Sequence, residues 1–159
     1  MKKRWLPLCL CALLLALLAG CSKAPAAQVQ DLPVADLYAQ ITGQFELPTL
    51  GAMPEDMIAE SYGVDLSKCS EYSVNMALMN VHTAQLSIFK LQDAADAPAF
   101  EAGCRRYAAS VAKGFEHYLP DQYALAQNPV VATMGNYVFF AIGEDAATLR
   151  DAFAAAVAA

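Results

Sequence analysis

The chain is poor in the side chains that catalytic and metal sites use most. It contains two histidines, one tryptophan and five cysteines among 159 residues. Neither His82 nor His117 stands at a metal-ligand spacing from a cysteine, and no C-x-x-C pair occurs. No serine has the G-x-S-x-G context of a nucleophile elbow. We therefore expect no metal, no cofactor and no catalytic residues.

Positive charge is also scarce. The chain has 10 basic and 16 acidic residues, and three of the basic ones lie in residues 1–20, which leaves seven basic residues and a formal net charge of −9 beyond residue 20. Nucleic-acid binding needs a basic face, so we expect no nucleic acid partner. Solubility and repulsion from the membrane account for the charge, and recognition of a basic partner is the alternative.

The N-terminal apolar run is too short for a spanning helix. It covers residues 5–19 and is interrupted by Pro7, whereas a bilayer needs about 20 apolar residues. A basic block, MKKR, precedes the run, which ends at the small residue Ala19 and is followed by Gly20. This arrangement is typical of a secretory leader. We therefore predict a signal peptide over residues 1–20.

The segment LAGC (18–21) resembles the lipobox of bacterial lipoproteins. The resemblance implies a diacylglycerol joined to Cys21 by a thioether and cleavage between Gly20 and Cys21. Two acyl chains anchor a protein stably without a spanning helix. We predict a protein held in the cell membrane through the diacylglyceryl lipid on Cys21, on the extracytoplasmic face. An ordinary leader or an uncleaved anchor is the alternative.

Residues 21–31 are polar and rich in alanine, and we expect them to form a lipid-anchored tether. As a flexible chain, residues 22–31 would span about 17 Å. Residues 32–159 are then expected to form a single domain, and a chain of this size buries roughly two-thirds of its unfolded surface.

Two cysteines remain in that domain, because Cys9 and Cys11 leave with the signal peptide and Cys21 carries lipid. The pair Cys69 and Cys104 permits one disulfide in an exported protein. Cys104, however, lies on the apolar stripe of a predicted helix, where a free thiol acts as a small hydrophobe. Both alternatives stay open.

Apolar spacing predicts helices over residues 33–41, 54–62 and about 97–119, and a last helix from Asp145. The third has an apolar stripe of residues Phe100, Cys104, Tyr107, Val111, Phe115 and Tyr118. We expect this stripe to face the core, and we expect Asp145 to cap the last helix.

Alternating apolar residues predict strands within residues 72–91. A single strand of that length would extend about 66 Å, so we predict a turn at residues 80–83 with His82 at its tip. A second hairpin is expected from strands near residues 130–133 and 137–142, and the nearly continuous apolar run of residues 137–142 predicts a strand covered on both faces or nearly so. The order helix, hairpin, helix, hairpin, helix indicates an α+β fold, an antiparallel sheet built from two β-hairpins with helices packed against it.

Residues 72–158 are similar to a family of small lipoproteins from Gram-positive bacteria that is known only as a domain of unknown function. The similar segments are IFKL (88–91), EHYLPDQYAL (116–125), GNYVFFAI (135–142) and LRDAF (149–153). The resemblance implies a lipid-anchored extracytoplasmic protein. It brings no activity and no catalytic residues, and it does not include Cys69 or Cys104.

We expect a non-catalytic binding or accessory module of the cell envelope that takes an envelope protein or a small ligand. One alternative is a small hydrolase-like envelope enzyme, which requires His82 or His117 to meet a serine and a carboxylate. The other is a structural assembly component. A concave apolar cavity with converging polar groups would favour a small ligand, and a flat apolar patch would favour a protein.

Overall fold

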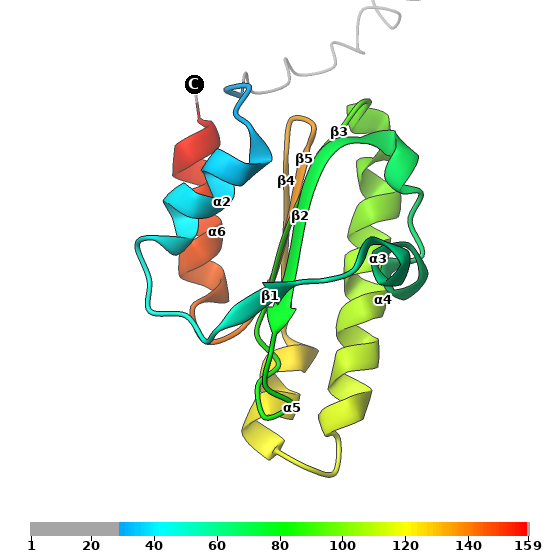
Figure 1. The fold of residues 1–159 in the computed structure, drawn as a ribbon, viewed down its shortest axis with the longest axis vertical. Coiled ribbons are helices and arrows are strands. Elements are labelled where there is room, and N and C mark those ends of the chain that lie inside the picture. Colours follow the sequence, from blue (N-terminus) through cyan, green and yellow to red (C-terminus); the bar gives the residue numbers. More distant parts are fainter. Residues whose placement is uncertain (1–28, 159) are drawn as a thin grey trace, which may run out of the picture.

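Five antiparallel strands form the centre of the computed structural model, which describes residues 29–158 (Figure 1). The strand order in the sheet is β1-β2-β3-β5-β4. The strands are β1 (Leu50–Ala52), β2 (Cys69–Ala77), β3 (Gln85–Leu91), β4 (Val130–Met134) and β5 (Tyr137–Ile142). The two predicted hairpins, β2–β3 and β4–β5, are confirmed and meet side by side through β3 and β5.

The turn of the second hairpin depends on Gly135. Its φ of +58° is a left-handed conformation that glycine adopts at little cost. Strand β1 was not predicted, because three residues are too few to show an alternating pattern.

Helices cover both faces of this sheet. On one face lie α3 (Glu55–Tyr62), α4 (Ala97–Phe115) and α5 (Pro120–Gln127), and on the other lie α2 (Val34–Thr42) and α6 (Ala146–Val157). Figure 1 shows α2 and α6 side by side on one side of the strands and α4 on the other. The α+β class and the predicted alternation of helices and hairpins are therefore confirmed.

Alternate side chains of β3 and β5 lie in two separate hydrophobic cores, one on each face of the sheet. Phe89, Val138 and Phe140 pack with α3 and α4, whereas Phe139 and Tyr137 pack with α2 and α6. Every residue of β3 and β5 is buried, which confirms the prediction that residues 137–142 are covered on both faces. Both cores are formed by residues within 29–158.

Two expectations about helix ends were wrong. Phe100, Cys104 and Tyr107 of the α4 stripe are buried, but Tyr118 is 59% exposed because α4 ends at Phe115. Pro120 does not mark the end of α4. It begins a separate helix, α5, where its missing N–H costs nothing. Asp145 stands at the N-cap of α6, but its side chain makes no capping hydrogen bond.

Helices α3 and α4 approach closely at Gly103. A Cβ atom there would lie 2.7 Å from the Tyr62 carbonyl oxygen and 2.7 Å from a methyl group of Val64. We expect Gly103→Ala to lower the free energy of unfolding by about 1–3 kcal/mol through overpacking. Gly114→Ala, in the same helix with nothing within 4 Å of its added Cβ, should instead raise it by about 0.5–1 kcal/mol. Urea unfolding followed by circular dichroism measures both, and a stabilised Gly103→Ala would contradict this packing.

The two ends of the described chain lie together at one end of the molecule. Val29 bridges Ala158, and the Gln30 amide donates to the Val157 carbonyl at 2.9 Å. The β4–β5 turn is also at this end, since Gly135 lies against Val29. Figure 1 shows α5 and the β2–β3 loop at the opposite end. Within residues 29–158, no helix is both long and apolar enough to cross a membrane.

Candidate functional site

A cavity of about 410 Å³ opens at the end of the sheet away from the chain termini. It lies where β3 begins and β5 ends, beside the paired residues Gln85 and Ile142. Loops before β1, before β3 and after β5 complete it, together with α5. Its walls are mostly apolar, formed by residues Leu47, Pro48, Leu50, Leu86, Leu125, Ile142 and Leu149. Its volume and lining are those of a small-molecule site.

Two amide side chains and one imidazole supply polar groups inside this cavity: Gln85, Gln122 and His82. Thr83 fixes the orientation of Gln122, whose Oε1 accepts from the Thr83 amide at 2.9 Å and from the Thr83 hydroxyl at 3.1 Å. This pair ties the loop before β3 to α5. The predicted place of His82, in the loop between β2 and β3, is confirmed.

Three exposed carboxylates, those of Glu46, Glu144 and Asp145, also line the cavity. None of them forms an ion pair in the part of the chain that the structure describes. Among residues 29–158, no lysine or arginine lines the cavity. The basic side chains of residues 29–158 lie elsewhere, at Lys68, Lys90, Arg105, Arg106, Lys113 and Arg150. The mouth of the cavity is therefore negatively charged.

The histidines do not form a catalytic arrangement in the described residues. Over residues 29–158, neither His82 nor His117 makes a side-chain hydrogen bond to a serine or a carboxylate, and His117 is exposed. In the same range, no group of three or more His, Cys, Asp or Glu residues is placed to hold a metal ion.

The predicted lipidation and cleavage residues, Gly20 and Cys21, lie outside the described residues. The described chain begins eight residues after Cys21, and its first residues are held firmly. Lys90 donates to Asp31 at 2.7 Å, to Glu71 at 3.1 Å and to the Leu32 carbonyl at 3.1 Å. We call Lys90, Glu71, Asp31 and Tyr137 the N-terminal clamp. Through it, residues 31–34 are fixed to the sheet.

Further hydrogen bonds complete the N-terminal clamp. Glu71 accepts from the Val34 amide at 2.7 Å, at the start of α2, and the Tyr137 hydroxyl donates to the Leu32 carbonyl at 2.7 Å. The bonds from Val34 and Lys90 lower the pKa of the Glu71 carboxyl. The bonds to Asp31 and Glu71 raise the pKa of Lys90, although burial opposes them. The clamp thus includes Asp31, the last residue that the sequence assigned to the tether.

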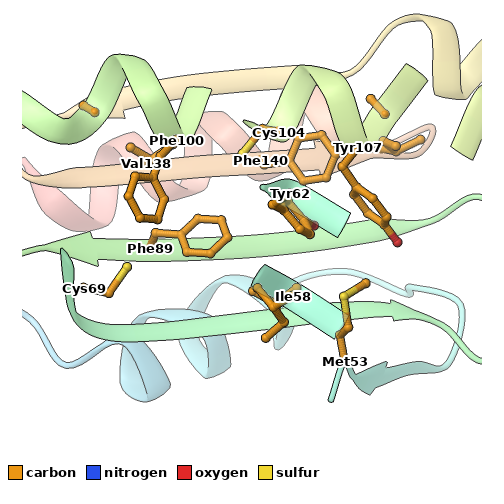
Figure 2. Close-up of a cluster of buried hydrophobic side chains, with 14 of the residues drawn as sticks. Met53, Ile58, Tyr62, Cys69, Phe89, Phe100, Cys104, Tyr107, Val138 and Phe140 are labelled. Carbon is orange, nitrogen blue, oxygen red and sulfur yellow. The ribbon is translucent and has the colours of Figure 1, made fainter. Parts of the chain in front are cut away.

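Cys69 and Cys104 are free thiols in this structure, and both are buried in the core that contains Phe89 and Phe100 (Figure 2). Cys69 begins β2 and Cys104 lies in the middle of α4. Burial raises the pKa of each thiol to about 12. Both cysteines therefore serve as packed apolar groups here.

We expect both thiols to resist modification until the domain unfolds. Raising a thiol pKa from 9.0 to about 12 lowers the reactive thiolate fraction at pH 8 about a thousandfold. In the chain of residues 22–159, Ellman's reagent should label neither cysteine in buffer and both in urea. Cys104, with no exposed surface, should react more slowly than Cys69, which is 8% exposed. Fast labelling of Cys104 in buffer would contradict its burial.

The cavity residues Glu46, Gln85, Gln122, Glu144 and Asp145 were not predicted as a site. They come from four separate segments, and only the sheet order brings these together. One local signal was present, since Gln85 is an amide at the start of a strand, QLSIFKL, that is apolar at four of its seven positions, and it is only 6% exposed.

Comparison with known proteins gives one match. The sequence model of a protein family described as a domain of unknown function (DUF4358) matches residues 45–143, more than half of the chain. No curated protein and no solved structure matches the chain. The matched segment runs from the loop before β1 to just after β5, so it contains the whole sheet and, of the described residues that line the cavity, all except Glu144, Asp145 and Leu149.

Proposed function

Because the chain belongs to the DUF4358 family, whose function is unknown, we propose a function from its own geometry. It is a lipid-anchored extracytoplasmic module of the cell envelope that binds a small ligand without catalysing a reaction. The observation that carries this proposal is the cavity of about 410 Å³, with apolar walls and amide side chains that converge on it.

The position of the cavity supports an anchored binding module. The N-terminal clamp holds residues 31–34 at one end of the domain, and the cavity lies at the other end. A lipid on Cys21 would therefore place the clamp end toward the membrane and the cavity away from it. A ligand arriving from outside the membrane could then reach the cavity directly.

Among the described residues, His82 lines the cavity but contacts neither a serine nor a carboxylate by hydrogen bond. A hydrolase-like mechanism needs such a partner to activate a nucleophile. The same site offers good conditions for binding, because its apolar walls exclude water and its amides can orient a ligand. Binding is therefore the function that this geometry favours.

The anchor is tested by Cys21→Ala. We expect the variant to take up no labelled palmitate, to keep the size of the uncleaved precursor and to lose the lipid-dependent membrane association of the mature form. Cys11→Ala, which alters a cysteine inside the predicted signal peptide, should label and mature normally. Normal label and size for Cys21→Ala would rule out lipidation at that residue.

The binding site is tested by blocking the cavity. Ala84 lines it and is only partly exposed, so Ala84→Phe should fill it. Small-molecule fractions from cells that make the protein are added to ¹⁵N-labelled chain 22–159, which contains both cores. We expect one fraction to shift the amide signals of residues 46–50, 82–86 and 142–149, and Ala84→Phe to remove this response.

The control is Ala124→Phe, an exposed position of α5 that does not line the cavity. This variant should respond as the unaltered chain does. Shifts that persist in Ala84→Phe, or that appear on other residues, would place binding elsewhere and contradict the proposal.

A further inference from the structure

We infer that the cavity takes a small organic cation, a ligand with an amino group on an apolar body and a hydrogen-bond acceptor. This inference rests on the binding function proposed above and names its ligand class. It depends on two independent observations, the charge at the mouth of the cavity and the unpaired amide donor of Gln85, a residue that lines the cavity.

The charge at the mouth is negative and uncompensated. Glu46 lies in the loop before β1, while Glu144 and Asp145 lie in the loop after β5, so carboxylates approach the cavity from two sides. None of them meets a basic residue in the described chain. Apolar walls strengthen the field of charges at such an opening. The cavity therefore attracts cations and repels anions.

The amide of Gln85 indicates the second feature of the ligand, a hydrogen-bond acceptor. Only 6% of this residue is exposed, and its Oε1 accepts a long hydrogen bond of 3.4 Å from the Tyr107 hydroxyl. Its amide nitrogen donates to no protein atom among residues 29–158. No fully buried side-chain polar atom in that range lacks a partner, so this nitrogen is accessible, and Gln85 lines the cavity. A ligand oxygen in the cavity can therefore accept a hydrogen bond from this amide.

Gln122 extends the same donor surface. Its Oε1 is already engaged by the Thr83 amide and hydroxyl, so its amide nitrogen remains as the free end of the side chain. The interior of the cavity thus offers hydrogen-bond donors between apolar walls, and its mouth offers carboxylates. A matching ligand has an apolar body that contacts the walls, a hydroxyl or carbonyl that accepts from the amide donors inside, and an amine that pairs with the carboxylates at the mouth.

Three probes of similar shape and different charge test the ligand class. They are tyramine, tyrosol and 3-(4-hydroxyphenyl)propanoate, which share a phenol hydroxyl that can accept a hydrogen bond, and each is titrated into ¹⁵N-labelled chain 22–159. We expect the amine to shift signals of residues 46–50, 82–86 and 142–149 and to bind at least about tenfold more tightly than the alcohol. The carboxylate should not bind. Added salt should weaken the binding of the amine but not that of the alcohol, because salt screens the attraction of the amine to the exposed carboxylates.

Two variants test whether the carboxylates at the mouth cause the preference for the amine over the alcohol. Glu144→Gln combined with Asp145→Asn should weaken amine binding about fivefold, as expected for exposed charges, and leave alcohol binding unchanged. Glu60→Gln removes a charge from an exposed position of α3, away from the cavity, and should change neither.

Equal binding of amine and alcohol, or an amine preference that survives the double variant, would overturn the cationic class. Shifts from none of the probes would overturn it as well. In each case the cell fractions and Ala84→Phe still decide separately whether the cavity binds a natural ligand. If none of those fractions shifts the amide signals of the cavity residues, the proposed binding function is contradicted instead.

Discussion

Phe89→Ala should lower the free energy of unfolding by about 3–5 kcal/mol, the largest effect that we expect from one substitution. Phe89 has no exposed surface and lies in β3, the central strand of the sheet. Its ring meets the edges of Tyr62 at 5.6 Å and Phe100 at 5.3 Å between centroids, so it joins β3 to α3 and α4 (Figure 2). Domains of this size have a total stability of about 5–15 kcal/mol.

Urea unfolding of chain 22–159 measures the effect, and two variants serve as controls. Phe89→Leu keeps most of the apolar volume and should cost less than half as much. Phe115→Ala alters a half-buried ring at the end of α4 and should also cost much less. A loss at Phe89 no larger than the loss at Phe115 would contradict the position of β3 at the centre of the fold.

The second large effect is expected at the N-terminal clamp. Lys90→Met keeps the apolar stem of the side chain but removes the ammonium group, which leaves Asp31 and Glu71 without their shared cation. Removing one partner of a buried ion pair costs about 3–5 kcal/mol. We expect about 2 kcal/mol here, because the Asp31 carboxylate is largely exposed and the Glu71 carboxylate is partly exposed. Hydrogen exchange at the Leu32 and Val34 amides should accelerate with it.

Lys68→Met is the matched control. Lys68 pairs with Asp96 at 3.7 Å on the surface, and its removal should cost less than about 1 kcal/mol. Exchange at the Val34 amide should not change in that variant. Equal losses from the two substitutions would show that the clamp adds nothing beyond an ordinary surface pair.

The pKa shifts set the pH range of the clamp. The pKa of Glu71 is lowered in the folded chain, so its contribution to stability is present above the ordinary carboxyl pKa and is lost as the pH falls through the lowered value. The pKa of Lys90 is raised, so its contribution is lost only as the pH rises through the raised value. Acid should therefore release residues 31–34 before the whole domain unfolds, and Lys90→Met should reduce this acid sensitivity. An unchanged acid response in Lys90→Met would contradict the assignment.

Much of the fold was predictable because periodic burial leaves a local pattern. The apolar run at residues 137–142 identified a strand covered on both faces, and the stripe from Phe100 to Tyr107 identified the buried face of α4. The exposure of Tyr118 was not predictable from its spacing, since spacing does not show where a helix leaves the sheet. Helix α5 was missed because its apolar residues have no helical periodicity and Pro120 suggested only an end.

The cavity was not predictable, because no local pattern encodes it. Its carboxylates and amides lie up to about a hundred residues apart in the sequence, from Glu46 to Asp145. They meet only because β5 inserts between β3 and β4 in the sheet and delivers the loop after β5 beside the start of β3. Among the cavity residues, Gln85 was set apart only as an amide at the start of a strand that is apolar at four of its seven positions.

The most direct test of the central claim is to ask what the protein carries in its own membrane. The full chain is expressed in its own cells, purified from membranes and extracted, and the small molecules released are quantified by mass spectrometry beside Ala84→Phe and Ala124→Phe. We predict that one small molecule accompanies the unaltered chain and Ala124→Phe in near-stoichiometric amount and is absent from Ala84→Phe. Identical extracts from all three chains would contradict a ligand-binding role for this cavity.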